Sequence, residues 1–507
     1  MALAPLLVAL AQASLRRALV LGFITGVVYF SGTLYWITRV MAVYGALQPF
    51  VAFLINALLV VYLALFPALF AVVMRRLVVS YGPRTLLLAP FVWVSTELGR
   101  TYLLTGFPWV LLGYSQVSVL PVAQTASLVG VYGLSALVAA VSAAVAYALG
   151  PVLGPALGPA KAGHYVGSVE SGFGTLSRTI PLAVVLILVM VLAAWGSLRV
   201  ARGDLTQGTP ARVALVQGNI AQDQKWDPRR APGIFDSYLR MTRQAIAAGA
   251  DLVIWPESAT PFTFEMDHVA ADSIRSLARE SRVPILFGSD QIERGTPTKY
   301  YNSAYLLRAD GSTGGVYRKM HLVPFGEYVP LKRLLFFAAP LVEAVSDFSA
   351  GDAAVLMDVD GHPVSTAICY EIVYPDLVRR FVAGGSELLT TITNDAWFGD
   401  TSAPHQHFAQ ASMRAIENGR YLVRAANTGI SGVVDPYGRV VVQSPLFEPA
   451  VVTGTVTYRT EKTLYTRIGD LFAYLAVLTT IAMLIARFKT SELRFKIGKR
   501  SVGRHQS

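Results

Sequence analysis

The first 200 residues consist of long apolar stretches separated by short polar connections, and one more apolar stretch lies near the C-terminus. A helix of roughly 20 apolar residues crosses the hydrocarbon core of a bilayer. The pattern therefore predicts a polytopic α-helical membrane bundle over residues 1–200 and a C-terminal transmembrane helix over 466–487. The predicted spans cover residues 18–37, 51–73, 86–104, 122–149, 180–198 and 469–486.

Two features of this predicted bundle stand apart. Glu97 and Arg100 lie three residues apart inside the third span, and charges at such depth mark either a functional site or a structural pair. We expect a structural pair.

The opening run, residues 1–11, is apolar but too short to cross a bilayer, and it lacks the basic start of a signal peptide. We expect it to be the end of an incomplete span.

Between residues 204 and 460 the pattern changes to short β-branched runs that alternate with amphipathic helical repeats. Runs such as RVALVQGNI, VPILFGS and LLTTITND predict buried strands, and residues 230–250 and 270–281 predict helices. Buried strands with intervening helices indicate an α/β layered domain over residues 212–460. Residues 150–178, rich in Gly, Pro and Ser, predict a flexible cytoplasmic loop, and residues 201–211 predict a linker.

Composition agrees with a membrane protein. Of the 507 residues, 53% are hydrophobic and 15% are charged, whereas soluble domains carry about a quarter charged residues. The formal net charge of +11 could indicate nucleic-acid binding, but the basic residues lie mainly at the ends of apolar segments. That placement fits anionic lipid headgroups and membrane topology, so we expect no nucleic-acid partner.

The basic residues also predict an orientation. They fall in alternate connections and in the tail, 488–507, and the positive-inside rule places these segments in the cytoplasm. The domain over 212–460 leaves the opposite end of the fifth span, so we expect it on the periplasmic face of a bacterial inner membrane. The basic connections contain Arg16, Arg17, Arg75, Arg76, Arg84, Lys161 and Arg178.

Three predicted strands end in a titratable side chain. LVIWPES delivers Glu257, VYRKMHLVPFGEYVP delivers Lys319, and AICYE delivers Cys369, the only cysteine of the chain. Taken singly, these residues are typical of a surface acid, a snorkelling lysine and a buried thiol. Together they supply what a thiol nucleophile needs, namely a base and a positive charge for the thiolate and the oxyanion. A single cysteine also excludes an intramolecular disulfide.

Other site types are not supported. His405 and His407 lie two residues apart, which on a helix points them to different sides, and no cysteine or acid completes a zinc site. The sequence has no G-x-S-x-G elbow, P-loop or dinucleotide fingerprint. We therefore expect no metal and no cofactor.

The set WPES, RKMHLVPFGEYVP, ICYE and NDAWFG resembles the nitrilase (carbon–nitrogen hydrolase) superfamily. The resemblance implies an αββα sandwich with a Glu–Lys–Cys triad at Glu257, Lys319 and Cys369. TGFPWVLLGYSQ and QGNIAQDQKWD resemble the bacterial apolipoprotein N-acyltransferase family, the branch that joins this domain to a membrane bundle and a closing C-terminal helix. That family normally has about eight spans, whereas six are predicted here.

The resemblance implies a ping-pong N-acylation of lipoproteins, the final step of their maturation. Cys369 would take an sn-1 acyl chain from a membrane phospholipid as a thioester, and the N-terminal amine of a diacylated apolipoprotein would accept it. Glu257 would be the base, and Lys319 with the backbone N–H after Cys369 would bind the oxyanion. We expect the enzyme to act as a monomer.

Supporting roles are expected around this triad. Glu327 could orient Lys319 or share the base role, Tyr370 and Glu371 could fix the loop of the nucleophile, and structural pairing with Arg or Lys is the alternative for either Glu. Trp226 and Trp397 are candidates for substrate binding, or alternatively for interface anchors.

The apolar run 331–345 could form a segment that dips into the lipid surface, or alternatively a core helix of the domain.

Two other functions compete with N-acylation. One is a membrane-tethered amidase or nitrilase, which would not need so many apolar spans. The other is a binding protein on an inactive nitrilase fold, which would be free to lose Glu257, Lys319 or Cys369.

Overall fold

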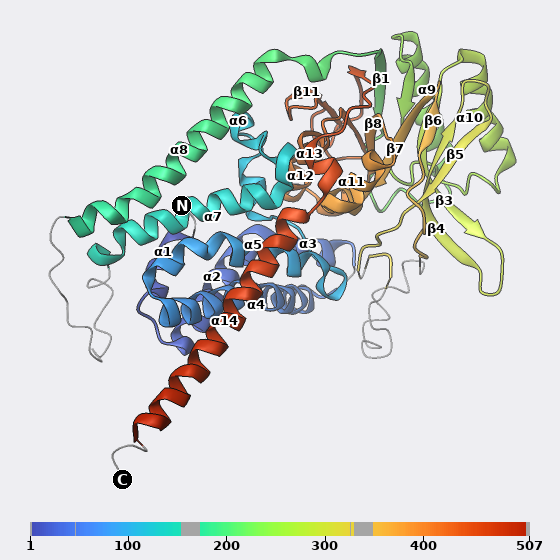
Figure 1. The fold of residues 1–507 in the computed structure, drawn as a ribbon. Coiled ribbons are helices and arrows are strands. Elements are labelled where there is room, and N and C mark those ends of the chain that lie inside the picture. The colour runs from blue at the N-terminus through green and yellow to red at the C-terminus, as the bar shows by residue number, and fades with distance from the viewer. Residues whose placement is uncertain (1–2, 46, 154–172, 325, 329–347, 503–507) are drawn as a thin grey trace.

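The computed structural model describes residues 3–45, 47–153, 173–324, 326–328 and 348–502. Helices α1–α8 and α14 gather on one side of the molecule, and two β-sheets with their covering helices lie on the other (Figure 1). The helical side contains α1 (Ala4–Leu10), α2 (Leu15–Leu34), α3 (Trp36–Val43), α4 (Pro49–Tyr81), α5 (Ala89–Tyr102), α6 (Leu120–Ala123), α7 (Ala126–Leu153), α8 (Phe173–Arg202) and α14 (Leu471–Val502).

Four helices of the described chain are long and apolar enough to cross a membrane. They correspond to the first, second, fourth and fifth predicted spans and cover Leu15–Leu34, Pro49–Tyr81, Ala126–Leu149 and Arg178–Arg202. The apolar part of α14, Leu471–Ala486, is shorter, because Gly469 (φ +60°) separates α13 (Leu464–Ile468) from α14. The closing helix therefore begins at Leu471 rather than at residue 466.

The third predicted span is wrong in length. Helix α5 has 14 residues instead of the 19 predicted over 86–104, and positive φ values at Leu104 and Thr105 end it. Glu97 and Arg100 explain the shortening, because both bind the segment that folds back after the helix. Glu97 Oε1 accepts from the Leu112 N–H at 2.7 Å, and Arg100 Nη1 donates to the Trp109 carbonyl at 2.8 Å.

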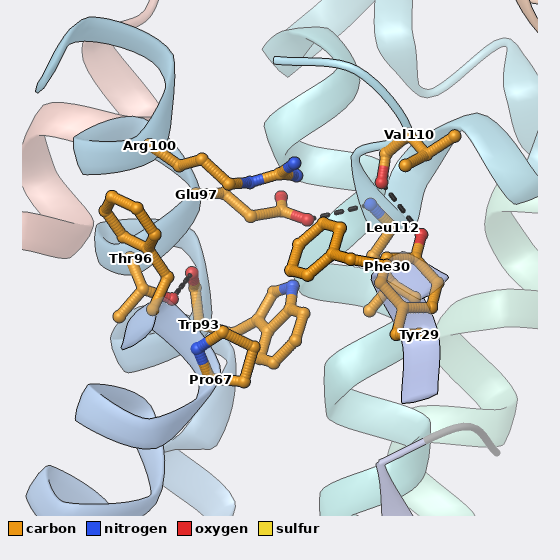
Figure 2. Close-up of a pocket in the computed structure, with 10 residues that line it drawn as sticks. Tyr29, Phe30, Pro67, Trp93, Thr96, Glu97, Arg100, Val110 and Leu112 are labelled. Carbon is orange, nitrogen blue, oxygen red and sulfur yellow. Dashed lines mark hydrogen bonds between the residues drawn. The ribbon is translucent and has the colours of Figure 1, made fainter. Parts of the chain in front are cut away.

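These two charged side chains thus bind backbone groups, whereas the expected ion pair between them is not found among the described residues. Figure 2 shows them beside a small cavity of about 20 Å³, between α2, α4 and α5. A space of this size has room for about one water molecule. This cavity is far too small for an acyl chain.

Two six-stranded mixed sheets form the rest of the protein. The first has the order β12-β1-β2-β3-β4-β5, with β1, β2 and β3 parallel. The second has the order β11-β10-β9-β8-β7-β6, with β7, β8 and β9 parallel. The strands are β1 (Pro210–Gln217), β2 (Leu252–Ile254), β3 (Ile285–Glu293), β4 (Lys299–Leu307), β5 (Thr313–Arg318), β6 (Met357–Val359), β7 (His362–Ile368), β8 (Leu388–Thr393), β9 (Leu422–Ala426), β10 (Gly432–Val434), β11 (Val440–Gln443) and β12 (Ala450–Thr457).

The sheets pack face to face between two helical layers. Side chains such as Leu215 and Leu306 from the first sheet share one core with Ile368 and Ile392 from the second. On its other face the first sheet buries residues such as Val253 against α9 (Ala231–Ala247) and α10 (His268–Ser281). Helices α11 (Pro375–Ala383) and α12 (Ala403–Asn418) cover the second sheet. The predicted αββα sandwich is confirmed, including the predicted helices that became α9 and α10.

Helix α12 connects this sandwich to the bundle. It packs against α7. Helix α7 is kinked at Val129 and Gly130, and directly after the kink the backbone N–H of Val131 donates to Glu417 Oε1 at 2.8 Å. Near the other end of α12, Gln406 Oε1 accepts from the Trp109 indole at 2.7 Å. Polar side chains of one helix thus hold both a bundle helix and the segment after α5.

Most of the predicted loop over 150–178 and all of the apolar run over 331–345 lie outside the described residues.

Candidate active site

Glu257, Lys319 and Glu327 meet in one buried cluster at the end of the first sheet. Glu257 follows β2 and Lys319 follows β5. The Lys319 ammonium lies 2.9 Å from Glu327 Oε1 and 3.4 Å from Glu257 Oε1. Asn302, on β4, donates its amide to the same two carboxylates at 2.9 and 2.7 Å. A lysine has three donors, so two carboxylates leave it one N–H for a third acceptor.

The electrostatics of this cluster favour a charged lysine beside a charged carboxylate. Burial alone would favour the neutral amine, but Glu327 and Glu257 outweigh it and hold the pKa of Lys319 above its ordinary value. Burial likewise disfavours the Glu257 carboxylate, yet Lys319, Lys225 and two hydrogen bonds hold its pKa below the ordinary value. One of those bonds comes from the Asn394 backbone N–H, 2.8 Å from Oε2. Glu257 is therefore ionised and can accept a proton.

Cys369 stands at a sharp turn directly after β7 in the second sheet. Its φ of +53° is in the left-handed region, a conformation that costs on the order of 1–3 kcal/mol and is common at active sites. The residue as a whole is half-buried. Burial among protein groups raises its pKa, the charge of Glu257 raises it further, and Lys319 opposes both. The resting pair is thus a protonated thiol with an ionised Glu257, which suits proton transfer during attack rather than a preformed thiolate.

Glu371 holds the turn together. Its Oε2 accepts from the Ile368 N–H at 2.7 Å, and Oε1 accepts from the Tyr317 hydroxyl and from the backbone of Met320 and His321 at 2.7–3.0 Å. Burial nevertheless raises the pKa of Glu371 to about 7. This carboxyl connects the segment before Cys369 to the segment after Lys319. These contacts suit the predicted role of Glu371 in fixing the loop, which stays a prediction.

Tyr370 connects the turn after β7 to the membrane bundle through an aromatic contact. Its ring stacks on Trp109, with centroids 6.2 Å apart and planes 15° apart, and Trp109 belongs to the segment that Glu97 and Arg100 fix. Trp109 also packs against His407, 5.3 Å between ring centroids. The aromatic side chains of a bundle segment thus lie beside the residue that follows Cys369.

The two tryptophan candidates lie in different surroundings. Trp226 is 50% exposed, and the ammonium of Lys225 lies 5.9 Å from its ring centroid. Trp397 is partly buried and packs edge-on against Tyr44, just after α3, with centroids 5.5 Å apart. Trp397 therefore lies where the sandwich meets the bundle.

Several site residues were not found from the sequence. Lys225 is buried and donates to the Glu257 carbonyl at 3.0 Å, and burial lowers the pKa of Lys225 to about 8. Asn302 and Asn394 hold the Glu257 carboxylate. Asn302 is brought to the site by the position of β4, whereas Lys225 lies in a turn and Asn394 directly follows β8. The sequence signal for Lys225 and Asn394 is that they lie in the resemblance motifs QDQKWD and NDAWFG.

Comparison with known proteins identifies both parts of the chain. The carbon–nitrogen hydrolase model matches residues 212–464, and the apolipoprotein N-acyltransferase N-terminal domain model matches residues 1–144. A protein of Geobacter metallireducens named apolipoprotein N-acyltransferase is 41% identical, with 94% of this chain and 88% of that protein covered. The chain belongs to the apolipoprotein N-acyltransferase family. A relative with the same name from Methylococcus capsulatus is 36% identical over 90% of this chain and 85% of its own.

Solved structures similar to this family member cover about half of it. An amidase from Nesterenkonia sp. is 22% identical, covers 53% of this chain and 97% of its own, and has a TM-score of 0.40. A carbon–nitrogen hydrolase from Helicobacter pylori is 17% identical, covers 49% of this chain and 89% of its own, and has a TM-score of 0.39.

We expect Asp290 to make the stability of this N-acyltransferase family member depend on pH. Burial raises the pKa of Asp290 to about 6, although Ser258 donates to it at 3.0 Å and Lys225 is near. A pKa above the unfolded value means that the contribution is complete below about pH 4 and is lost as pH rises through 6. Relative to wild type, we expect Asp290→Asn to gain on the order of 2 kcal/mol of unfolding free energy between pH 4 and pH 8.

Denaturant unfolding of both proteins in detergent, at several pH values, measures this difference. A gap between variant and wild type that stays constant over the whole pH range would contradict the assignment. Glu371, whose raised pKa acts in the same direction, is present in both proteins and cancels in the comparison.

Proposed function

We propose that the protein N-acylates lipoproteins with an acyl chain from a membrane phospholipid, through a thioester on Cys369. Its relatives named apolipoprotein N-acyltransferase support an acyltransferase of lipoproteins in general. The observation that supports the finer proposal is the 3.4 Å contact between Lys319 and Glu257, together with the effect of both charges on the pKa of Cys369.

In the first half-reaction the Cys369 sulfur attacks the sn-1 ester carbonyl carbon, and Glu257 takes the thiol proton. The tetrahedral oxyanion binds the free N–H of Lys319 and the backbone N–H of Tyr370, and each such donor is commonly worth about 3–4 kcal/mol. The carbon–oxygen ester bond then breaks, and Glu257 returns the proton to the departing oxygen. The products are a thioester on Cys369 and a lysophospholipid.

In the second half-reaction the N-terminal amine of a diacylated apolipoprotein attacks the thioester carbonyl carbon. Glu257 takes a proton from that nitrogen, the carbon–sulfur bond breaks, and the proton returns to the Cys369 sulfur. The amide formed is more stable than the thioester consumed, so transfer proceeds forward. Glu327 orients Lys319 through their 2.9 Å contact, and no metal or cofactor enters either step.

The proposal also includes a place in the cell. The domain over 212–460 lies on the periplasmic face of the bacterial inner membrane, the basic tail lies in the cytoplasm, and the enzyme acts as a monomer. What supports this orientation is the alternation of basic connections along the sequence.

Incubation with phospholipid alone is expected to add one acyl mass to Cys369. Without an amine acceptor the second half-reaction is blocked, so the thioester accumulates. Intact-mass spectrometry of the full chain in phosphatidylethanolamine vesicles measures the adduct, and hydroxylamine should remove it because it cleaves thioesters.

Two results would decide against the proposal. A protein that transfers acyl chains to a diacylated lipopeptide without any Cys369 adduct under the same conditions lacks the thioester step. Steady release of free fatty acid at the rate of lysophospholipid formation, even with lipopeptide present, would instead indicate a hydrolase.

A further inference from the structure

We propose that His407 is a positioning residue that orients the oxyanion-binding N–H of Tyr370 by holding the opposite end of the same peptide unit. This inference rests on the proposed thioester chemistry. His407 lies on α12, is fully buried, and has no part in the two half-reactions. Its Nε2 lies 3.2 Å from the carbonyl oxygen of Cys369.

The contact fixes the position of the imidazole proton. A carbonyl oxygen only accepts, so Nε2 must carry the proton and donate it to Cys369. The other nitrogen, Nδ1, faces the Arg424 guanidinium at 2.9 Å and the Asp395 carboxylate at 3.1 Å. Burial and the charge of Arg424 lower the pKa of His407, so Nδ1 accepts from Arg424. Arg424 also binds Asp395 at 2.7 Å, which locks all three side chains.

Peptide geometry connects this hydrogen bond to the oxyanion. The unit between Cys369 and Tyr370 is planar and trans, so its C=O and N–H point in opposite directions. Tyr370 is the second residue of the 3₁₀ turn over Cys369–Val373, and the first N–H groups of a helix have no acceptor within it. A bond that holds the carbonyl toward α12 therefore aims the Tyr370 N–H away from α12.

The peptide unit between Ala367 and Ile368 is held independently, because Glu371 Oε2 accepts from the Ile368 N–H. Cys369 has a left-handed φ, and the 3₁₀ turn that starts there gives its carbonyl one acceptor contact, with the Ile372 N–H, which leaves the carbonyl able to accept a second one. His407 supplies that contact from a helix that Gln406 and Glu417 anchor on the membrane bundle. The orientation of the oxyanion donor is thereby tied to the docking of the sandwich on the bundle.

Two amide replacements of His407 separate positioning from mere packing. Glutamine places an amide N–H near the site of Nε2–H, so His407→Gln keeps the donor to Cys369. Asparagine reaches only the position of Nδ1, so His407→Asn keeps a contact with Arg424 or Asp395 and loses the donor. His405→Asn, at the exposed neighbouring histidine, is the matched control.

The measurements are acylation and alkylation of the same thiol. Single-turnover acylation of Cys369 in phosphatidylethanolamine vesicles passes through an oxyanion, whereas alkylation by iodoacetamide does not. We expect His407→Asn to acylate about 10- to 100-fold more slowly. We expect His407→Gln to stay within about 5-fold of wild type, and alkylation of all variants to stay within about 3-fold.

Each other outcome overturns the inference. Wild-type acylation by His407→Asn means that the contact is not needed, and equal losses in the Asn and Gln variants mean that His407 only packs. A parallel fall in alkylation means that the thiol itself has moved. Absence of an acyl adduct in the wild-type protein would instead refute the proposed function, and the inference with it.

Discussion

Replacing Cys369 by alanine is expected to abolish acyl transfer, with a loss of at least about 10⁴-fold. The described chain offers no second thiol, and the ionised Glu257 beside it cannot replace sulfur as the acyl carrier in this turn. Transfer from vesicle phospholipid to a synthetic diacylated lipopeptide, followed by mass spectrometry of the lipopeptide, measures the loss.

The fold of this variant should survive. Only one sulfur atom is removed from a half-buried residue, so the unfolding free energy should change by no more than about 1–2 kcal/mol. Cys369→Ser is the control of nearly equal shape. We expect it to be as inactive as Cys369→Ala, because a hydroxyl gives up its proton to Glu257 much less readily than a thiol does. Transfer at near wild-type rate by purified Cys369→Ala would exclude the mechanism.

Lys319→Met is expected to abolish transfer and to destabilise the fold by about 3–5 kcal/mol. Methionine fills much of the space of the lysine stem but leaves the carboxylates of Glu257 and Glu327 buried without their cation. Breaking a buried ion pair by removing one partner typically costs this much, since an uncompensated charge remains. The unfolding temperature in detergent and the rate of lipopeptide acylation report the two effects separately.

A double variant distinguishes charge from shape. Lys319→Met with Glu327→Gln removes one unpaired carboxylate, so it should recover a substantial part of the lost stability and none of the activity. Recovery of transfer in the double variant would remove Lys319 from the oxyanion site. Unchanged stability in Lys319→Met alone would show that the two carboxylates are protonated in the fold.

Much of the sandwich could be predicted because the residue pattern of each segment agrees with the place of that segment in the folded domain. The run LLTTITND is apolar and β-branched on both faces, and it became the central buried strand β8. The segments over 230–250 and 270–281 carry one apolar face each, and they cover the first sheet as α9 and α10. The strand ends that deliver Glu257 and Lys319 were found for the same reason, since apolar strands with a terminal charge are unusual.

What the sequence could not show depends on contacts between distant segments. An apolar run does not reveal that α5 stops after 14 residues, because Glu97 and Arg100 bind a backbone that returns to them only in three dimensions. His407 gave a similar difficulty. Considered as a metal ligand it had no partners, and its contact with the Cys369 carbonyl arises from the packing of α12 on the second sheet.

Strand β12 closes the first sheet last. It pairs with β1 along its full length, so the sheet that carries Glu257 and Lys319 is complete only after residue 457 has been synthesised. Strand β7, which ends directly before Cys369, precedes β12 in the chain, so the first sheet still lacks this edge when Cys369 has been synthesised. The complete first sheet therefore needs the chain up to residue 457, shortly before α13 and the closing helix α14.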